Sequence, residues 1–290
     1  MKHLNTLDEH TLEHLEDNIF PNIFSGNAIL FLGAGASWTE ERSYLGTSII
    51  DYYQDKLRID LSTNDLVEFV DRASRLDSFH RNLFDQYIIK LLKRLSPTET
   101  HERIVTLDWR QIITTNLDLV IENAYASVEG KPKENKEIVT IRNIGDYNKQ
   151  LSNNQVGYVK LNGCISDPSD YKFVFSSQDF SDSQEYYNLV LGNLASLSPD
   201  VSFISIGYSF TDGLSSHLLN QLNKNNLHKS RKLINIEPYP NDDLTPYLYD
   251  NGVISLKCTA DEFFEAYSKW EGEKLNHVAC LLYTSDAADE

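Results

Sequence analysis

The chain has 290 residues and carries 26 basic against 43 acidic side chains, for a formal net charge of −17 with histidine neutral. Its 41% apolar and 11% aromatic content excludes a disordered chain, and its acidity argues against general nucleic-acid binding, which needs a basic surface. No apolar run approaches the ~18 residues of a membrane span, and Met1 to Asn18 lacks the apolar segment of a signal peptide. Three cysteines without a close pair predict neither a disulfide framework nor a metal site, so we expect a cytoplasmic protein.

Helical patterns dominate the first third of the chain. Leu12, Leu15 and Ile19 form a short helical stripe that should end at Pro21. After an apolar run at 27–32, the chain from about Ser43 to Leu107 is predicted to be helical. One helical face in this segment is predicted to consist of Leu83, Tyr87, Ile88, Leu91, Leu92 and Leu95. Ser96 as N-cap, with Pro97 at N1 and Glu99 at N3, predicts the start of the next helix.

Apolar runs of strand length recur along the chain. They cover 27–32, 111–115, 156–161, 201–206, 233–236 and 253–256. Most are apolar throughout, which predicts an α/β fold with a parallel sheet and helices on both faces. Because ligands of such sheets bind beyond the carboxyl ends of the strands, the polar turns that follow should converge on one edge. Thr259 and Glu262 predict the capping box of a last helix, which extends through Trp270.

The first strand runs into a glycine turn, Gly33-Ala34-Gly35-Ala36-Ser37. The glycines permit positive φ and close backbone approach, and N–H groups at the start of a following helix can hold a pyrophosphate. The spacing G-x-G-x-S departs from the dinucleotide fingerprint G-x-G-x-x-G, and the Gly-Lys-Ser/Thr of a P-loop is absent from the sequence. Taken alone, the turn is equally compatible with a structural role.

Six clusters together are more specific than any one of them. They read FLGAGAS (31–37), TTNLD (114–118), KLNGC (160–164), IGYSFTD (206–212), INIEP (234–238) and CTADEF (258–263). Their order and spacing, from about Asn27 to Trp270, resemble the SIR2-like family, specifically its zinc-free bacterial branch with the wordings TTNYD, KLHG and GYSFSD. The resemblance implies a SIR2-like domain over residues 1–279, with a Rossmann-like sheet, a small helical insertion at about 43–107, and NAD as ligand.

The resemblance also implies a role for each matching position. Gly33, Ala34, Gly35 and Ser37 would cradle the diphosphate; Thr115 and Asn116 would face the nicotinamide-side ribose, with Asp118 fixing their loop; Gly207 and Ser209 would contact phosphate and ribose; Asn235 and Glu237 would bind the adenosine ribose; and Thr259 would lie near adenine. The chemistry is compatible, since a carboxylate accepts two hydrogen bonds from a ribose diol and an amide can hold a water against a sugar.

Structural alternatives stand beside several of these roles. The alternative role for Asp118 and Ser37 is to cap a helix, and the alternative for Asn235 and Glu237 is an ordinary loop position. Trp38 and Trp109 are predicted to pack in the core or at its rim, and His101 is predicted to be a structural histidine.

Two features of the sequence depart from the family pattern. Cys164, Cys258 and Cys280 stand alone, whereas sirtuin deacetylases pair their cysteines around zinc, so NAD hydrolysis is favoured over protein deacylation. Asn162 stands where KLHG has its histidine base, and an amide takes up no proton at neutral pH. A general base typically raises the rate by ~10²–10⁴-fold. Nicotinamide, however, leaves as a neutral molecule through an oxocarbenium-like transition state, so its departure needs no acid. We therefore expect a slowed hydrolase with Asn116, Asp118 and Asn162 as catalytic positions; a natural variant, a deliberate His→Asn inactivation and a binding-only pseudoenzyme remain open as explanations.

The activity implied by the resemblance is that of an NAD⁺ glycohydrolase, which releases nicotinamide and ADP-ribose or its cyclic form. Zinc-free bacterial relatives commonly act as antiphage effectors that deplete NAD. Two alternatives are a catalytically silent module with NAD or ADP-ribose as regulatory ligand, and an NAD-dependent protein deacylase. Because such domains assemble into oligomers and are often fused to sensors, we expect a homo-oligomer and a C-terminal sensor domain or regulatory partner, with no nucleic-acid or membrane partner.

The last residues form a separate segment in this interpretation. Residues 280–290 read CLLYTSDAADE, which resembles the translation of a transposon-type sequencing adapter; a native flexible terminus is the alternative. We expect this segment to lie outside the native domain.

Overall fold

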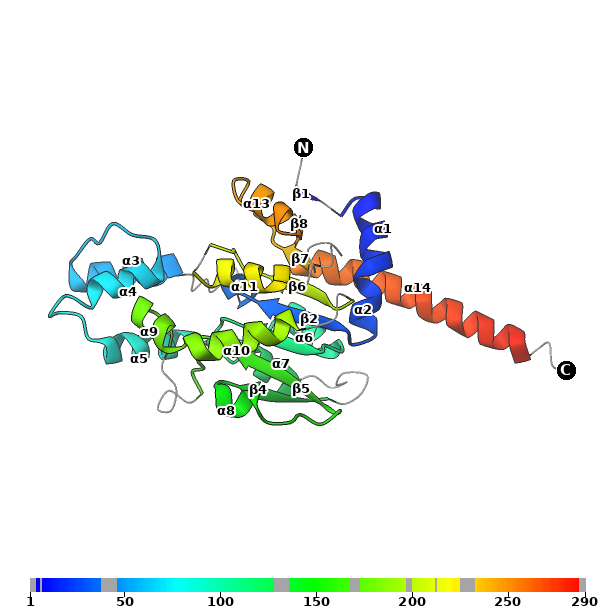
Figure 1. Cartoon of the computed structure of the whole chain (residues 1–290), viewed down its shortest axis with the longest axis horizontal. Helices are drawn as coiled ribbons and strands as arrows, with labels where there is room; N and C mark the ends of the chain where they lie inside the picture. Colours follow the sequence, from blue (N-terminus) through cyan, green and yellow to red (C-terminus); the bar gives the residue numbers. More distant parts are fainter. Residues whose placement is uncertain are drawn as a thin grey trace.

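A single parallel sheet organises the protein. The computed structural model describes residues 4–5, 7–37, 46–127, 136–166, 173–196, 200–211, 213–224 and 233–286 (Figure 1). Within these ranges eight strands pair, all in parallel, in the order β1-β8-β7-β6-β2-β3-β5-β4. The strands are β1 (Leu4–Asn5), β2 (Ala28–Leu32), β3 (Gln111–Thr114), β4 (Glu137–Ile141), β5 (Gln155–Lys160), β6 (Ser202–Ile206), β7 (Leu233–Ile236) and β8 (Val253–Leu256). The predicted α/β, Rossmann-like architecture is confirmed.

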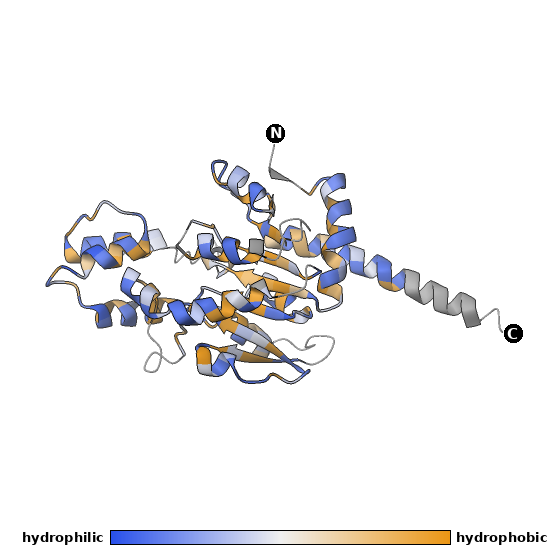
Figure 2. Ribbon diagram, in the orientation of Figure 1, coloured by the Kyte–Doolittle hydropathy of each residue, from blue (hydrophilic) through white to orange (hydrophobic). Residues whose placement is uncertain are grey.

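Helices cover both faces of this sheet. They are α1 (Glu9–Asn18), α2 (Phe20–Phe24), α3 (Gly46–Leu57), α4 (Leu66–Ala73), α5 (Arg81–Leu92), α6 (Glu99–Thr106), α7 (Val120–Ser127), α8 (Ile144–Tyr147), α9 (Ser177–Asp182), α10 (Gln184–Ala195), α11 (Gly213–Lys224), α13 (Thr245–Asp250) and α14 (Ala260–Asp286). Alternate strand residues such as Leu30 and Phe31 enter two different cores: α1, α2, α6, α7 and α14 cover the first, and α10, α11 and α13 the second. Figure 2 shows the resulting hydrophobic strands between more polar helices.

The helical insertion forms a third core of its own. Its helices α3, α4 and α5 bury Ile50, Phe69, Phe84 and Ile88 together with Phe175 from the segment before α9. They lie at one end of the molecule beside α9 (Figure 1). Helix α6, by contrast, packs Ile104 and Val105 into the first sheet core, so the insertion proper consists of α3–α5.

Several local predictions differ from the structure. Helix α1 ends at Asn18, just before Pro21, and Pro21 itself lies in the first turn of the separate short helix α2, where its missing N–H is harmless. The N-cap of α6 is Thr98 and not Ser96, since the His101 ring accepts the Thr98 N–H in the reciprocal capping contact. Leu83 is 47% exposed, so it lies off the buried face of α5. The last helix continues past Trp270 to Asp286 and leaves the body of the protein (Figure 1).

The sequence prediction also missed the outer strands β1 and β4. Among the described strands, β4 pairs only with β5 and is largely half-buried, so its apolar pattern is weaker than that of the central strands. In the described part of the chain, none of the helices has the length and apolar character required to cross a bilayer.

Candidate functional site

The strand order fixes where a ligand site should form. From β2 the chain builds outward through β3 and β5 on one side, and through β6, β7 and β8 on the other. The direction in which successive strands are added across the sheet therefore reverses between β2 and β6. At such a reversal point a crevice opens beyond the carboxyl ends of the strands. The turns that follow β2, β3, β5, β6 and β7 meet at this edge.

Two of these turns interlock through glycine. The Gly33 N–H donates to the Ile206 carbonyl at 3.0 Å, and the Gly35 N–H to the Gly207 carbonyl at 2.9 Å. A Cβ on Gly35 would lie 2.9 Å from the Gly207 Cα, and Gly207 itself has φ +64°. The predicted close approach is confirmed, and it joins two protein backbones. Neither Gly33 nor Gly35 uses the positive φ that glycine permits, so the close approach is what requires glycine at these two positions.

Three polar side chains form a hydrogen-bond relay between the ends of β2 and β3. Ser37 Oγ donates to Asp118 Oδ2 at 2.8 Å, and Asn116 Nδ2 donates to Ser37 Oγ at 3.0 Å and to the Gly33 carbonyl at 2.9 Å. The other Asp118 oxygen accepts the Val120 N–H at 3.0 Å, so the helix-cap alternative for Asp118 is confirmed alongside the Ser37 contact. Asp118 is 3% exposed. Its carboxylate thus positions neighbours and faces little solvent.

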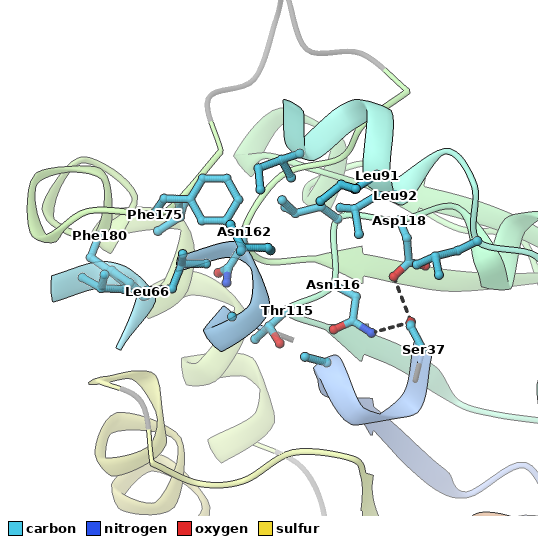
Figure 3. Close-up of a pocket in the computed structure, with 18 residues that line it drawn as sticks. Ser37, Leu66, Leu91, Leu92, Thr115, Asn116, Asp118, Asn162, Phe175 and Phe180 are labelled. Atoms are coloured by element: carbon cyan, nitrogen blue, oxygen red, sulfur yellow. Dashed lines mark hydrogen bonds between the residues drawn. The ribbon is translucent and has the colours of Figure 1, made fainter. Parts of the chain in front are cut away.

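The relay fixes the orientation of the Asn116 amide. An ionised carboxylate only accepts, so Ser37 must donate to Asp118 and can only accept from Asn116. Asn116 must therefore turn its NH₂ group toward Ser37 and Gly33. Figure 3 shows the consequence: the Asn116 oxygen is directed away from Ser37, into the pocket.

Asn162 lies across the same pocket, just beyond β5. Its Oδ1 accepts a hydrogen bond from the Tyr187 hydroxyl of α10 at 3.0 Å. The NH₂ group is the remaining donor of this side chain. The pocket thus pairs one oriented acceptor, from Asn116, with one oriented amide at Asn162 (Figure 3).

The pocket itself has a polar floor and an apolar wall. Its volume is about 220 Å³. Ala34, Ser37, Thr115, Asn116, Asp118 and Asn162 contribute from the sheet edge. The wall is formed by the insertion and the α9 region, with the residues Ile49, Leu66, Val67, Ile88, Leu91, Leu92, Leu95, Val174, Phe175 and Phe180. Such a wall excludes water from one side of the polar groups.

A second relay lies on the other side of the reversal point. Ser205 Oγ donates to Asn235 Oδ1 at 2.6 Å, and Asn235 Nδ2 donates to Glu237 Oε1 at 3.1 Å. Asn235 is fully buried in β7, and Glu237 is half-buried just beyond it. Burial raises the pKa of the Glu237 carboxyl to about 7.

The remaining predicted positions lie outside the pocket lining. Ser209 is exposed, and its Oγ lies 2.8 Å from the Thr211 hydroxyl. Thr259 caps α14, with its N–H and hydroxyl donating to Glu262, so the predicted capping box is confirmed. The described residues contain no cluster of three or more histidine, cysteine or acidic side chains suited to a metal ion.

His101 is a structural residue, as predicted. It is 3% exposed; its Nδ1 accepts the Thr98 N–H at 3.0 Å, which makes Nε2 the protonated nitrogen facing the Ala36 carbonyl at 2.8 Å. Burial lowers its pKa, and the ring ties α6 to the glycine turn. Trp109 is a core residue, as predicted, with its indole N–H on the Ile104 carbonyl. Trp38 lies outside the described residues.

Sequence reasoning missed three contributors to the site. Tyr187, which orients Asn162, lies in the middle of α10 and follows no motif. Phe175 reaches the pocket from the segment before α9 and Phe180 from α9 itself, and neither stretch gave a strand or helix signal in the sequence. Only their apolar character could have pointed to them, and apolar side chains are also what ordinary cores contain.

Family membership follows from a match to a family model. Residues 110–254 match the family model described as the SIR2-like domain. Because the match spans half of the chain, the protein belongs to the SIR2-like domain family. A search of curated proteins found no match to the chain.

Solved structures with a similar course of the chain come from Sir2 proteins. One is a Sir2 homolog–NAD complex, with 14% identity, TM-score 0.45, and coverage of 94% of this chain and 97% of that chain. Another, described under the mechanism and regulation of Sir2 enzymes, has 13% identity, TM-score 0.49, and coverage of 92% and 97%. A mutant Sir2 homologue bound to ADP-ribose has 12% identity, TM-score 0.44, and coverage of 93% and 98%.

Proposed function

We propose that this protein is an NAD⁺ glycohydrolase that cleaves the bond between nicotinamide and ribose. The observation that carries the proposal is the Asp118–Ser37–Asn116 relay, which holds an amide oxygen in a pocket opposite Asn162. Family membership supports NAD as the substrate.

The chemistry of the substrate fits these groups. Nicotinamide leaves NAD⁺ as a neutral molecule, while positive charge develops on the ribose. A carbonyl dipole held in place before the reaction stabilises that charge without reorganisation, and it accepts a hydrogen bond from an attacking water or a ribose hydroxyl. The apolar wall suits a flat heteroaromatic ring. The dinucleotide would then cross the reversal point, with its adenosine ribose at Glu237, whose carboxylate the buried Asn235 positions from behind.

Asn162 limits the rate in this proposal. Its amide cannot take a proton from water or a ribose hydroxyl, so the general-base contribution of ~10²–10⁴-fold is missing. The Asn162→His variant should therefore release nicotinamide faster by a factor in that range. The Tyr187 hydroxyl, which now bonds the Asn162 amide, would orient the imidazole.

The test is to incubate the purified protein with NAD⁺ and to follow free nicotinamide by chromatography. Native protein should release it slowly, the Asn162→His variant faster, and the Asn116→Ala variant not measurably. Tight ADP-ribose binding without release from either of the first two would instead indicate a silent binding module. Release that requires an acetyl-lysine peptide would indicate a deacylase.

The biological role proposed for this activity is antiphage defence through NAD depletion. It predicts that cells expressing this protein lose NAD after phage infection, and that cells expressing the Asn116→Ala variant do not. An unchanged NAD pool in infected cells would contradict it.

A further inference from the structure

A buried lysine lies directly behind the loop that carries the site. Lys160, the last residue of β5, is completely buried. Its Nζ donates to the backbone carbonyl of Asp118 and, at 3.1 Å, to Glu122 Oε1 on α7. The Tyr158 ring lies 5.2 Å from the same ammonium. Lys160, Glu122 and Tyr158 are not among the residues that line the pocket, and the mechanism above uses none of the three.

We propose that Lys160 is a positioning residue, with Glu122 as its counter-ion, that sets the placement of the loop Thr115–Asp118 relative to Asn162. The inference rests on the proposed function for its catalytic consequence, but its structural content can be tested separately. Lys160 and Asn162 are two residues apart, so one short segment carries both the anchor and a pocket side chain.

The contacts of Asp118 show how the anchor works. The carboxylate is held by Ser37 and by the Val120 N–H, and the carbonyl on the other side of the residue is held by Lys160. Asp118 is therefore clamped from the glycine turn, from α7 and from β5 at once. Since Asn116 is oriented through Ser37 and Asp118, the bond from Lys160 connects the end of β5 to the relay that aims the Asn116 oxygen.

Stabilisation of the fold does not by itself account for the buried polar groups around Lys160. Glu122 Oε2 and the Tyr158 hydroxyl are buried without a hydrogen-bond partner, which costs free energy. Well-packed apolar side chains commonly replace a buried ion pair at no loss of stability. An apolar replacement would, however, remove the one donor that reaches the Asp118 carbonyl from β5. Positioning therefore explains a buried charge here better than stabilisation does.

This distinction defines the experiment. The Lys160→Met/Glu122→Leu double variant removes both charges and keeps apolar volume, so its unfolding midpoint should stay close to native, whereas Lys160→Met alone leaves Glu122 unpaired and should be less stable. In the double variant, hydrogen exchange of the amides at 115–119 should accelerate about tenfold or more, relative to amides of β2. The kcat for nicotinamide release should fall about tenfold, with KM for NAD⁺ nearly unchanged.

A matched control uses the ion pair between Lys136 and Asp108, which lies near the amino-terminal ends of the strands. The Lys136→Met/Asp108→Leu variant should leave both kcat and exchange at 115–119 unchanged. The positioning role is overturned if the Lys160 double variant keeps native kcat and native exchange. If that variant does not fold, exchange in the native protein still decides, because amides at 115–119 that exchange far faster than those of β5 would show that no clamp exists.

The two proposals fail in different ways. Absence of nicotinamide release from native protein and from Asn162→His would count against the proposed function, while the exchange measurement would still test the clamp. Normal release with unchanged exchange in the double variant would overturn the positioning role and leave the proposed function intact.

Discussion

The interlocked glycine turns give the sharpest prediction about stability. Gly207 has φ +64°, and a Cβ there would lie 2.8 Å from the Gly35 Cα and even closer to other backbone atoms of that turn. An L-residue in this conformation costs roughly 1–2 kcal/mol, and forcing a methyl group against fixed backbone costs about 1–3 kcal/mol more. Gly207→Ala should therefore destabilise the protein by about 2–5 kcal/mol, a large share of a typical total of ~5–15 kcal/mol.

A matched control comes from α10. Gly192 lies in the middle of this helix, and a Cβ there would have no neighbour within 4 Å. Gly192→Ala should stabilise by about 0.5–1 kcal/mol, because alanine loses less backbone entropy on folding. Both variants differ from native by one methyl group, so the comparison isolates the local backbone environment.

Urea unfolding monitored by far-ultraviolet circular dichroism measures both effects. The Gly207→Ala midpoint should fall and the Gly192→Ala midpoint should rise, with unchanged slopes. If Gly207→Ala loses less than about 1 kcal/mol, the turns can separate at little cost and the interlock does not fix the geometry of the site.

Three further outcomes follow from the site. Ser37→Ala should slow nicotinamide release about tenfold or more, because the Asn116 amide loses its orientation. Ser127→Ala, which removes a hydroxyl bonded to the Ala124 carbonyl within α7, should not slow it, and equal rates for the two variants would refute the relay. The affinity for ADP-ribose, measured by calorimetry, should strengthen as pH rises from about 6 to about 8, because the Glu237 carboxyl has a pKa of about 7 and accepts hydrogen bonds from ribose hydroxyls when it is ionised. The Glu237→Gln variant should show little change of affinity over the same pH range. Burial lowers the pKa of His101 below its unfolded value of about 6.5, so below that pH the unfolded chain binds a proton that the folded protein does not. The free energy of unfolding should therefore decline as pH falls below about 6.5. A His101→Gln variant that shows the same decline between about pH 7 and pH 5.5 would contradict this.

The strands of the sheet were accessible from sequence for a clear physical reason. A central strand in a parallel sheet is buried on both faces, so it must be apolar at every position, and β2 and β6 are buried throughout. The outer strand β4 has only one neighbour and a half-buried surface, and its pattern did not stand out. Helix starts were less certain, because both Ser96 and Thr98 are good caps and only the position of His101 decides between them.

The candidate site was accessible as a set of positions but not as a geometry. The residue types after each strand indicated that polar groups meet at one edge, and the pocket does collect Ser37, Thr115, Asn116, Asp118 and Asn162. The sequence could not tell whether Asp118 caps a helix or serves the site, and in the structure it bonds Ser37 with one oxygen and caps α7 with the other.

The sequence by itself therefore determined which polar and apolar residue types stand at the strand ends, because a buried parallel strand and the turn after it are encoded by a few adjacent residues. What only the tertiary structure decided is how those ends engage one another. The Gly35–Gly207 bond, the direction of the Asn116 amide and the Lys160–Asp118 contact each join segments far apart in the chain. Their geometry depends on strand order and register, which are properties of the packed sheet and not of any local run of residues.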